Sequence, residues 1–271
     1  KFSYPKSMRS IYNGSRHYEV GGEKLPSVTT ILSLTKSQKD KDALNKWKKD
    51  VGFANATAIA KSSSDRGTSM HSYVEAILLG RMNGELIEEV NLPKKMAETI
   101  VTNGINDHVD EIYGCEVVLH YPNLYAGTAD AISNFDSKMA VLDFKQSNKP
   151  KQREWSSVNE YFLQLCLYSM AHDKVYGTNI KTGVILMCTP NLLFQKFESI
   201  HFGDHHRFNK KDVAAISKKF GTFTSAKKII LTTEKDFSRM LVLNESAVAL
   251  SKMPFFLNTE NASASRTSAH L

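Results

Sequence analysis

The chain has 271 residues, of which 41% are hydrophobic, and it carries a formal net charge of +7. This length suffices for one large domain or two small ones, and the composition is typical of a globular protein with a sizeable core. No run approaches the roughly 18 apolar residues of a membrane span. Three scattered cysteines without a CxxC pair argue against a disulfide framework and a zinc knuckle. The positive charge favours polyanionic partners, nucleic acid first, although it is weak evidence alone because many proteins are mildly basic.

The first part of the chain is expected to combine short strands with helices. Residues 1–35 predict short strands joined by a Gly-Gly turn, and then a helix that begins near Ser27. From residue 39 to 80, apolar side chains recur at helical spacing. The stretch SSSDRGT, residues 62–68, predicts a break and a new helix start. A further helix is predicted over residues 93–109.

The second part of the chain begins with a change to strand-like patterns. Residues 114–146 give three strand-like runs, and residues 156–176 predict a helix. We therefore expect a mixed α/β domain with a helical N-terminal addition. The remaining expected elements are strands at 182–188 and 192–202, helices at 209–220 and 236–252, and a disordered polar tail.

The stretch YAGTADAISNFDSKMAVLDFKQ predicts a β-hairpin that carries three charged side chains. Strand side chains alternate between faces, so Asp143 and Lys145 share one face, and Leu142 and Phe144 share the other, which packs on the core. If the turn is formed by residues 136–137, paired residue numbers sum to 273. Asp130 then lies opposite Asp143, with Cβ atoms roughly 4.5–5.5 Å apart.

Two carboxylates opposed at this range destabilise a hairpin unless a positive charge lies between them. A Mg²⁺ ion is one solution, because it takes oxygen ligands and is held by one or two carboxylates. A surface ion pair between Asp143 and Lys145 is the other. The hairpin alone does not decide between the two.

Further polar residues recur on neighbouring elements. His71 and Glu75 are four residues apart and therefore lie on one helical face, and so do Gln164 and Tyr168. Glu116 lies one strand upstream of the hairpin. Each pair is a weak signal alone, since a lone histidine is more often a core or capping residue.

Taken in order, these residues resemble the motifs of the PD-(D/E)XK nuclease superfamily and of its RecB-like exonuclease branch. Within that branch the chain looks most like the group of the mitochondrial genome maintenance exonucleases and related phage enzymes. The resemblance covers roughly residues 25–190. One departure is Ala129, which stands where the superfamily name has proline, a position that varies among RecB-like members. The matching positions are Gly67 and His71, Glu116, Gly127 and Asp130, Asp143-Phe144-Lys145, and Gln164 with Tyr168.

The resemblance implies a restriction-endonuclease-like α/β fold, a mixed β-sheet flanked by helices. Residues 1–110 would form an N-terminal β-hairpin and helical region that contributes to the nuclease domain. Residues 111–256 would form the nuclease core and 257–271 a disordered tail, giving one structural domain overall. The implied activity is a metal-dependent DNA exonuclease, with Mg²⁺ or Mn²⁺ as cofactor. An iron–sulfur cluster is not expected, because family members that bind one use four cysteines.

The resemblance also implies a role for each matching residue. Asp130 and Asp143 would bind the metal together with the backbone carbonyl of Phe144, and His71 would complete the set. Lys145 would act on the attacking water. The remaining implied roles are a second metal or a positioned water for Glu116, support of the His71 turn by Glu75, and orientation of the site or substrate contact by Gln164 and Tyr168.

DNA contacts are expected from the segment that follows the hairpin. Lys149, Lys151 and Arg153 could hold backbone phosphates, and a solvated basic loop is an equally good interpretation. Trp155 and Tyr161 could stack on bases, although core packing is the better interpretation of Tyr161. By analogy, the helical residues 39–80 could form an arch over the cleft that selects single strands or free ends.

The expected partner is therefore DNA, single-stranded or with a free end, and no membrane. A monomer is favoured. The alternatives are a double-strand-end resecting exonuclease of recombination, for which a trimeric ring would speak, and a non-catalytic DNA-binding module with the nuclease fold. The expected setting is DNA replication, repair or recombination inside a cell, in phage-infected or bacterial cytoplasm, or in a mitochondrion if a targeting segment was removed.

Overall fold

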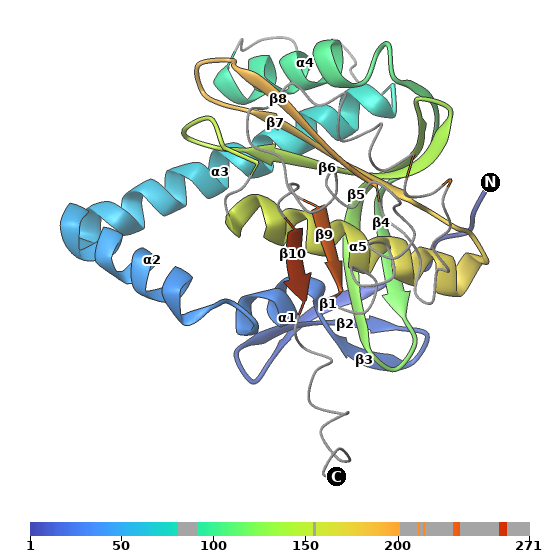
Figure 1. Cartoon of the computed structure of the whole chain (residues 1–271), viewed down its shortest axis with the longest axis horizontal. Coiled ribbons are helices and arrows are strands. Elements are labelled where there is room, and N and C mark those ends of the chain that lie inside the picture. Colours follow the sequence, from blue (N-terminus) through green and yellow to red (C-terminus); the bar gives the residue numbers. More distant parts are fainter. Residues whose placement is uncertain are drawn as a thin grey trace. The chain divides into compact units, whose positions relative to one another are not determined.

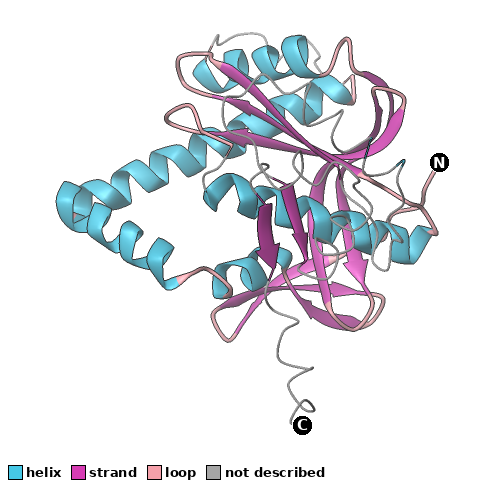
Figure 2. Cartoon of the chain, viewed as in Figure 1, coloured by secondary structure: helices cyan, strands magenta, loops and turns pink. Residues whose placement is uncertain are grey.

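The computed structural model describes residues 1–80, 91–153 and 156–200, and beyond these chiefly 230–233 and 255–258 (Figures 1 and 2). The chain divides into two compact units, residues 1–203 and 204–271. The first unit contains strands β1 Met8–Tyr12, β2 Ser15–Val20, β3 Glu23–Pro26, β4 Val109–Tyr121, β5 Tyr125–Phe135, β6 Lys138–Gln146, β7 Thr182–Cys188 and β8 Phe194–Ile200, and helices α1 Val28–Leu34, α2 Gln38–Val51, α3 Phe53–Leu78, α4 Leu92–Gly104 and α5 Ser156–Tyr176.

The centre of this unit is a five-stranded mixed sheet in the order β4-β5-β6-β7-β8. All neighbours are antiparallel except β6 and β7, which run parallel because α5 forms the crossover between them. This topology confirms the expected mixed α/β fold with helices flanking the sheet, consistent with a restriction-endonuclease-like architecture.

Helices cover both faces of the sheet, and each face has its own hydrophobic core. On one face α3 and α4 contribute Met70, Met96 and Ile100, which pack against Leu142 and Phe144 of β6. The other core is formed by α1 and α5 against the opposite face of the sheet, with Val28, Phe162, Leu165 and Tyr168 among its members, and Val141 from β6. The prediction that Leu142 and Phe144 face a core away from Asp143 and Lys145 is therefore confirmed.

The predicted hairpin register is also confirmed. The pairs from Ala131↔Leu142 to Phe135↔Lys138 all sum to 273. Asp136 and Ser137 form the turn with φ of 47° and 60°, the left-handed conformation that a tight two-residue hairpin turn requires. The ladder ends at Ala131↔Leu142, one pair before Asp130 and Asp143.

The N-terminal strands form a separate antiparallel sheet in the order β1-β2-β3, with the predicted turn at Gly21 and Gly22. It is followed by α1, whose N-cap is Ser27, as the sequence predicted. The Ser27 hydroxyl accepts a hydrogen bond from the Thr30 backbone N–H at 3.0 Å.

The predicted helix break at residues 62–68 is wrong, because α3 runs without interruption through SSSDRGT. Its 26 residues span about 39 Å at 1.5 Å per residue. Tertiary contacts with the end of β6 explain why a segment of helix-neutral residues stays helical. The Gln146 amide donates to the Ser63 carbonyl at 3.0 Å, and the Arg66 Nε donates to Gln146 Oε1 at 3.1 Å. Local propensity is a weak prior that such contacts override.

In the second unit, β9 Ile230–Thr233 and β10 Phe255–Asn258 pair in parallel. The helices predicted at 209–220 and 236–252 lie outside the described residues, apart from isolated helical positions at Lys211 and Ala214. Of the predicted tail, Leu257 and Asn258 belong to β10 and the rest is not described. The expected boundaries after residues 110 and 256 stay predictions. Among the described helices, none has the length and apolarity needed to span a membrane.

Candidate metal and active site

Strands β4 and β5 change faces together at one point, and two carboxylates lie there. The pairs Cys115↔Ala131 and Val117↔Ala129 bracket Glu116 and Asp130. Residues two apart in a regular strand share a face. Here Cys115 and Ala131 belong to the core under α3 and α4, whereas Val117 and Ala129 belong to the core under α1 and α5. The two carboxylates therefore lie at the point where the paired strands change the core that each face contributes to.

Glu116 has a strained backbone conformation at this point. Its φ is 48°, a left-handed conformation that is uncommon for a residue other than glycine, asparagine or aspartate. Such conformations cost on the order of 1–3 kcal/mol and are found preferentially at functional sites. Asp130, opposite it, accepts a hydrogen bond from the Phe144 N–H at 2.6 Å through Oδ2, so its side chain occupies the place where the β5–β6 ladder would have continued.

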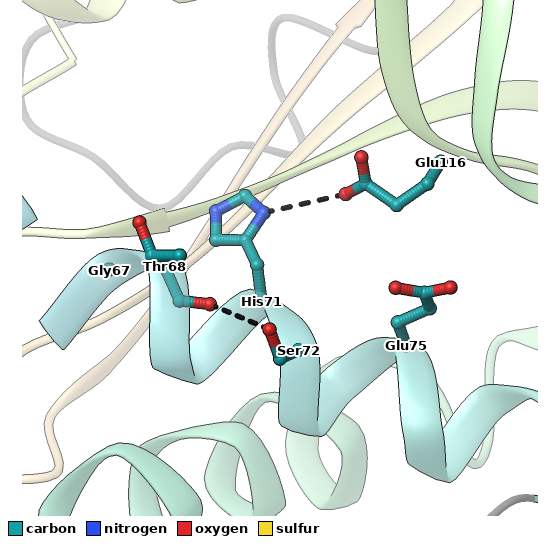
Figure 3. A pocket seen from close by; sticks show the side chains of 6 residues that line it. All are labelled: Gly67, Thr68, His71, Ser72, Glu75 and Glu116. Atoms are coloured by element: carbon teal, nitrogen blue, oxygen red, sulfur yellow. Dashed lines mark hydrogen bonds and ion pairs between the residues drawn. The ribbon is translucent and has the colours of Figure 1, made fainter. Parts of the chain in front are cut away.

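His71 brings the third ligand from α3. Its Nδ1 lies 3.9 Å from Glu116 Oε1 (Figure 3). The same nitrogen lies 3.7 Å from Asp130 Oδ2. One ligand atom from each of the three residues lies within 4.8 Å of the others. Burial alone would lower the pKa of His71, but the carboxylates of Asp130 and Glu116 outweigh it and raise this pKa. The three residues form a group that could hold a divalent metal.

Two of these elements, α3 and β4, line a pocket of about 380 Å³. On its α3 side lie Gly67, Thr68, Ser72 and Glu75, beside His71, and Glu116 lies across from them (Figure 3). Glu75 is one turn beyond His71 on the same helical face, as predicted from the spacing. The pocket therefore opens onto His71 and Glu116, two of the three candidate metal ligands.

Asp143 and Lys145 form a buried ion pair beside this group. Lys145 Nζ lies 2.5 Å from Asp143 Oδ1, and Asp143 is 1% exposed. Burial raises the pKa of Asp143 to about 6, Lys145 partly offsets this rise, and Asp130 adds to it. Burial would lower the pKa of Lys145, but the charges of Asp143 and Asp130 raise it instead. Lys145 is therefore an ammonium group at neutral pH.

The donor set fits a hard divalent cation. Within the described residues, Asp143 Oδ2 is buried without a hydrogen-bond partner, and an unsatisfied buried carboxylate oxygen is costly unless a cation binds it. Two carboxylates and one imidazole, with the Asp143 carboxylate as a further oxygen donor, suit Mg²⁺ or Mn²⁺ better than a thiophilic metal. Asp143 is not part of the compact group of His71, Glu116 and Asp130. Glu116, to which the resemblance gave only a second metal or a positioned water, belongs to this group.

Helix α5 supplies the other side of the site. Gln164 Nε2 donates to the Tyr168 hydroxyl at 3.1 Å, and Tyr168 is buried. A Cβ atom at Gly127 of β5 would lie 2.8 Å from Tyr168 Cε1, so only glycine allows this approach. The Tyr161 ring centroid lies 5.1 Å from Lys145 Nζ. Sequence reasoning treated Tyr161 as core, and its spacing of three from Gln164 was the signal that could have linked it to the site.

The predicted DNA contacts differ in how the protein uses them. Lys149 is exposed. Lys151 Nζ donates to Ser157 Oγ at 3.0 Å, and burial lowers its pKa. Arg153 donates to Asn159 Oδ1 at 2.9 Å and stacks 4.1 Å from the Phe162 ring. Both therefore contact the first turns of α5, and their contact with DNA stays a prediction. Trp155 lies outside the described residues.

One arginine near the site was missed by the sequence reasoning. Arg66 precedes Gly67 on α3, and its guanidinium bonds Gln146 Oε1 and Asn148 Oδ1, just beyond Lys145. A basic residue five positions before the predicted ligand His71, in a polar stretch, was the available signal.

Comparison with known proteins gives distant relatives. The chain is 27% identical over 173 residues to the mitochondrial genome maintenance exonuclease 1 of Xenopus tropicalis and 25% identical over 170 residues to that of Homo sapiens. Each match covers 60% of this chain and 48% of the relative, so the chain spans about half the length of these proteins. No protein-family profile matches the chain. The chain is thus a distant relative of a named exonuclease.

Two further similarities carry less weight. A tetraacyldisaccharide 4'-kinase of Bacteroides thetaiotaomicron is 27% identical over 158 residues, which is 58% of this chain and 40% of the relative. The solved structure of SSO0001 matches with a TM-score of 0.30 and 14% identity, over 68% of this chain and 73% of that one, which is too low to bear on the fold.

Proposed function

We propose that the chain is a metal-dependent DNA exonuclease that hydrolyses phosphodiester bonds, with single-stranded DNA as the preferred substrate. The observation that carries the proposal is the convergence of His71, Glu116 and Asp130 within 4.8 Å beside the Asp143–Lys145 pair. The distant similarity to mitochondrial genome maintenance exonuclease 1 supports the same chemistry. Membership of the PD-(D/E)XK superfamily and of its RecB-like branch is part of this proposal, and so is a role in DNA replication, repair or recombination.

The proposed metal ligands are His71, Glu116 and Asp130, with Asp143 Oδ2 and the Phe144 carbonyl available to the same ion. A bound Mg²⁺ or Mn²⁺ supplies Lewis-acid polarisation of the phosphoryl oxygen and a lowered pKa for a water. The Phe144 N–H fixes Asp130 through its 2.6 Å hydrogen bond. The nitrogen of His71 and the oxygens of Glu116 and Asp130 converge without rearrangement of their elements, which supports a preorganised site.

Lys145 is the proposed charge-stabilising group. As an ammonium it can donate to a non-bridging phosphate oxygen and offset the charge that develops during hydrolysis. Its pair with Asp143 and its place over Tyr161 hold it in one orientation. Gln164 and the buried Tyr168 hydroxyl support β5 next to Asp130, so we assign them a positioning role.

Degradation of end-labelled DNA tests this proposal. Single- and double-stranded oligonucleotides are incubated with Mg²⁺, Mn²⁺ or EDTA and with the parent, Asp130→Asn, Asp143→Asn, Glu116→Gln and Lys145→Ala. The parent is expected to degrade DNA only with metal. Each variant should lose at least a hundredfold in rate, because removal of one preorganised electrostatic group costs about 10²–10³. Circular single strands, which lack ends, should resist.

Asp136→Asn is the matched control on the same hairpin. Asp136 pairs with His108 at 2.8 Å, away from the pocket, and asparagine tolerates its positive φ. Its rate should equal that of the parent. Unchanged degradation by Asp143→Asn and Lys145→Ala would contradict the assigned site. Binding without cleavage by the parent would favour the DNA-binding module, and a trimer that prefers double-stranded ends would favour the recombination exonuclease.

A further inference from the structure

We propose that Arg66 is a phosphate-binding residue of the site, which contacts a phosphate of the DNA strand next to the one that is cleaved. This inference rests on the proposed function and names a substrate contact within it. Arg66 lies five residues before His71 on α3, about 7.5 Å along the helix axis. A nucleotide strand carries one phosphate per nucleotide, so a phosphate next to the one that is cleaved can lie beside Arg66.

The guanidinium of Arg66 is held by neutral groups. Its Nε donates to Gln146 Oε1 at 3.1 Å, and its Nη2 donates to Asn148 Oδ1 and, at 3.5 Å, to Ser63 Oγ. Within the described part of the chain, no carboxylate lies within ion-pair distance of it. Because its acceptors are neutral, no protein carboxylate offsets the charge of this half-buried guanidinium, and it can form a charge-assisted hydrogen bond with a phosphate.

The acceptors of Arg66 are themselves fixed. The Gln146 amide donates to the Ser63 carbonyl at 3.0 Å, and Asn148 Nδ2 donates to Ser63 Oγ at 3.0 Å. These bonds join the turn of α3 before the pocket to the end of the strand that carries Asp143 and Lys145. The guanidinium fork is therefore oriented before substrate arrives, which lowers the entropic cost of binding a phosphate.

The surroundings favour a strand of DNA as the ligand. Gly67, the next residue, lines the pocket with His71, and a Cβ atom there would approach Gln146 Cγ to 3.3 Å. Lys149, exposed, follows Asn148 directly. Arg66 is thus adjacent in sequence to a residue that lines the pocket, and its acceptor Asn148 is adjacent to an exposed lysine.

Metal-free DNA binding tests the contact apart from catalysis. Fluorescence anisotropy of a labelled single strand in EDTA is measured from 50 to 300 mM salt for the parent, Arg66→Gln and Arg66→Lys. Arg66→Gln should weaken binding about tenfold or more at low salt and lower the slope of log affinity against log salt by about 0.7. Arg66→Lys keeps the charge and should restore the slope. Arg9→Gln, an exposed arginine of β1, is the matched control and should equal the parent.

Neutral linkages identify the phosphate. Substrates carry one methylphosphonate at successive positions from the labelled end, or a 5′-hydroxyl in place of a 5′-phosphate. When the methylphosphonate replaces the phosphate that Arg66 contacts, the parent and Arg66→Gln should bind the DNA equally, since the charge that Arg66 binds is absent. A terminal or an internal phosphate is thereby distinguished.

The inference fails if Arg66→Gln lowers the melting temperature while the salt slope and affinity stay those of the parent, because Arg66 would then only join α3 to β6. It also fails if no neutral linkage removes the difference between parent and variant. In both cases metal-dependent cleavage by the parent would leave the proposed function intact. A parent that neither binds nor cleaves DNA would overturn both.

Discussion

Lys145 has two neighbours that act on its ammonium in different ways. Asp143 pairs with it by charge, and the Tyr161 ring, 5.1 Å from Nζ, offers its negative face. The ion pair orients the ammonium group towards Asp143, and the contact with the ring orients it towards Tyr161. Lys145 therefore retains donors for a substrate oxygen in a defined orientation.

Substitution of Tyr161 tests the contribution of the ring. Tyr161→Phe keeps the ring face and should retain most of the nuclease rate. Tyr161→Leu should lose about twofold to thirtyfold in rate, the range of a cation–π contact worth about 0.5–2 kcal/mol. Tyr12→Leu removes a comparable contact with Lys24, 4.0 Å from Nζ to ring, outside the site and should leave the rate unchanged. Equal losses in Tyr161→Phe and Tyr161→Leu would mean that the hydroxyl, not the ring, carries the effect.

Each polar pair was a weak signal alone, and only the order and spacing of the motifs gathered His71, Asp130, Asp143 and Lys145 into one candidate site, whose roles stay predictions. The sequence did not predict that Glu116 lies beside Asp130 and His71. That position depends on a left-handed φ at Glu116 and on a change of face in the paired strands β4 and β5. Nothing in the residue type encodes either feature, since glutamate prefers other conformations.

At the scale of elements, local chemistry predicted what local contacts control. The hairpin register followed from alternation and a two-residue turn, and both were confirmed. The break in α3 was wrong because Ser63 and Arg66 are stabilised by Gln146, some 80 positions away in the chain. Long-range pairing of this kind leaves no mark in a short window of sequence.

Two helix caps of the same type should differ in their effect on stability. Ser27→Ala removes the cap of α1, whose residues Val28 and Leu32 are buried, and should lower the free energy of unfolding by about 1–2 kcal/mol. Ser37→Ala removes the equivalent cap of α2, a helix without a buried residue, and should change global unfolding by less than about 0.5 kcal/mol. Chemical denaturation measures both. Equal losses would show that α2 unfolds together with the core.

At the scale of the whole molecule, the N-terminal segment of the first unit is hydrogen-bonded to α5, one of the helices that cover its sheet. The Tyr4 hydroxyl lies 3.1 Å from His172 Nε2, and His172 Nδ1 lies 2.7 Å from Thr178 Oγ1. Thr178 in turn donates to Asp173 at 2.7 Å. This network joins residues 168 positions apart without using any residue of the proposed site. The order of elements predicted the layers, but this contact between chain segments depends on the finished fold.

The network makes the stability of the unit depend on pH. Burial lowers the pKa of His172 from 6.5 to about 4. The unfolded chain therefore binds a proton below about pH 6.5 that the folded chain takes up only near pH 4. The contribution of His172 is complete above pH 6.5 and is lost as the pH falls to 4, by roughly 2–3 kcal/mol. Asp143 acts in the opposite direction, because its raised pKa favours the folded state most at low pH.

His172→Gln, which does not titrate, isolates this contribution from that of Asp143. Its free energy of unfolding should be below that of the parent at pH 7.5, since the buried bonds to Tyr4 and Thr178 are weakened. The deficit should shrink by roughly 2–3 kcal/mol by pH 4, because only the parent loses stability through His172. Urea denaturation in EDTA at half-unit pH steps measures the difference. His17→Gln, on the N-terminal hairpin, should follow the parent. A deficit that is constant with pH would mean that His172 is protonated equally in the folded and unfolded chain, and that burial does not hold it neutral.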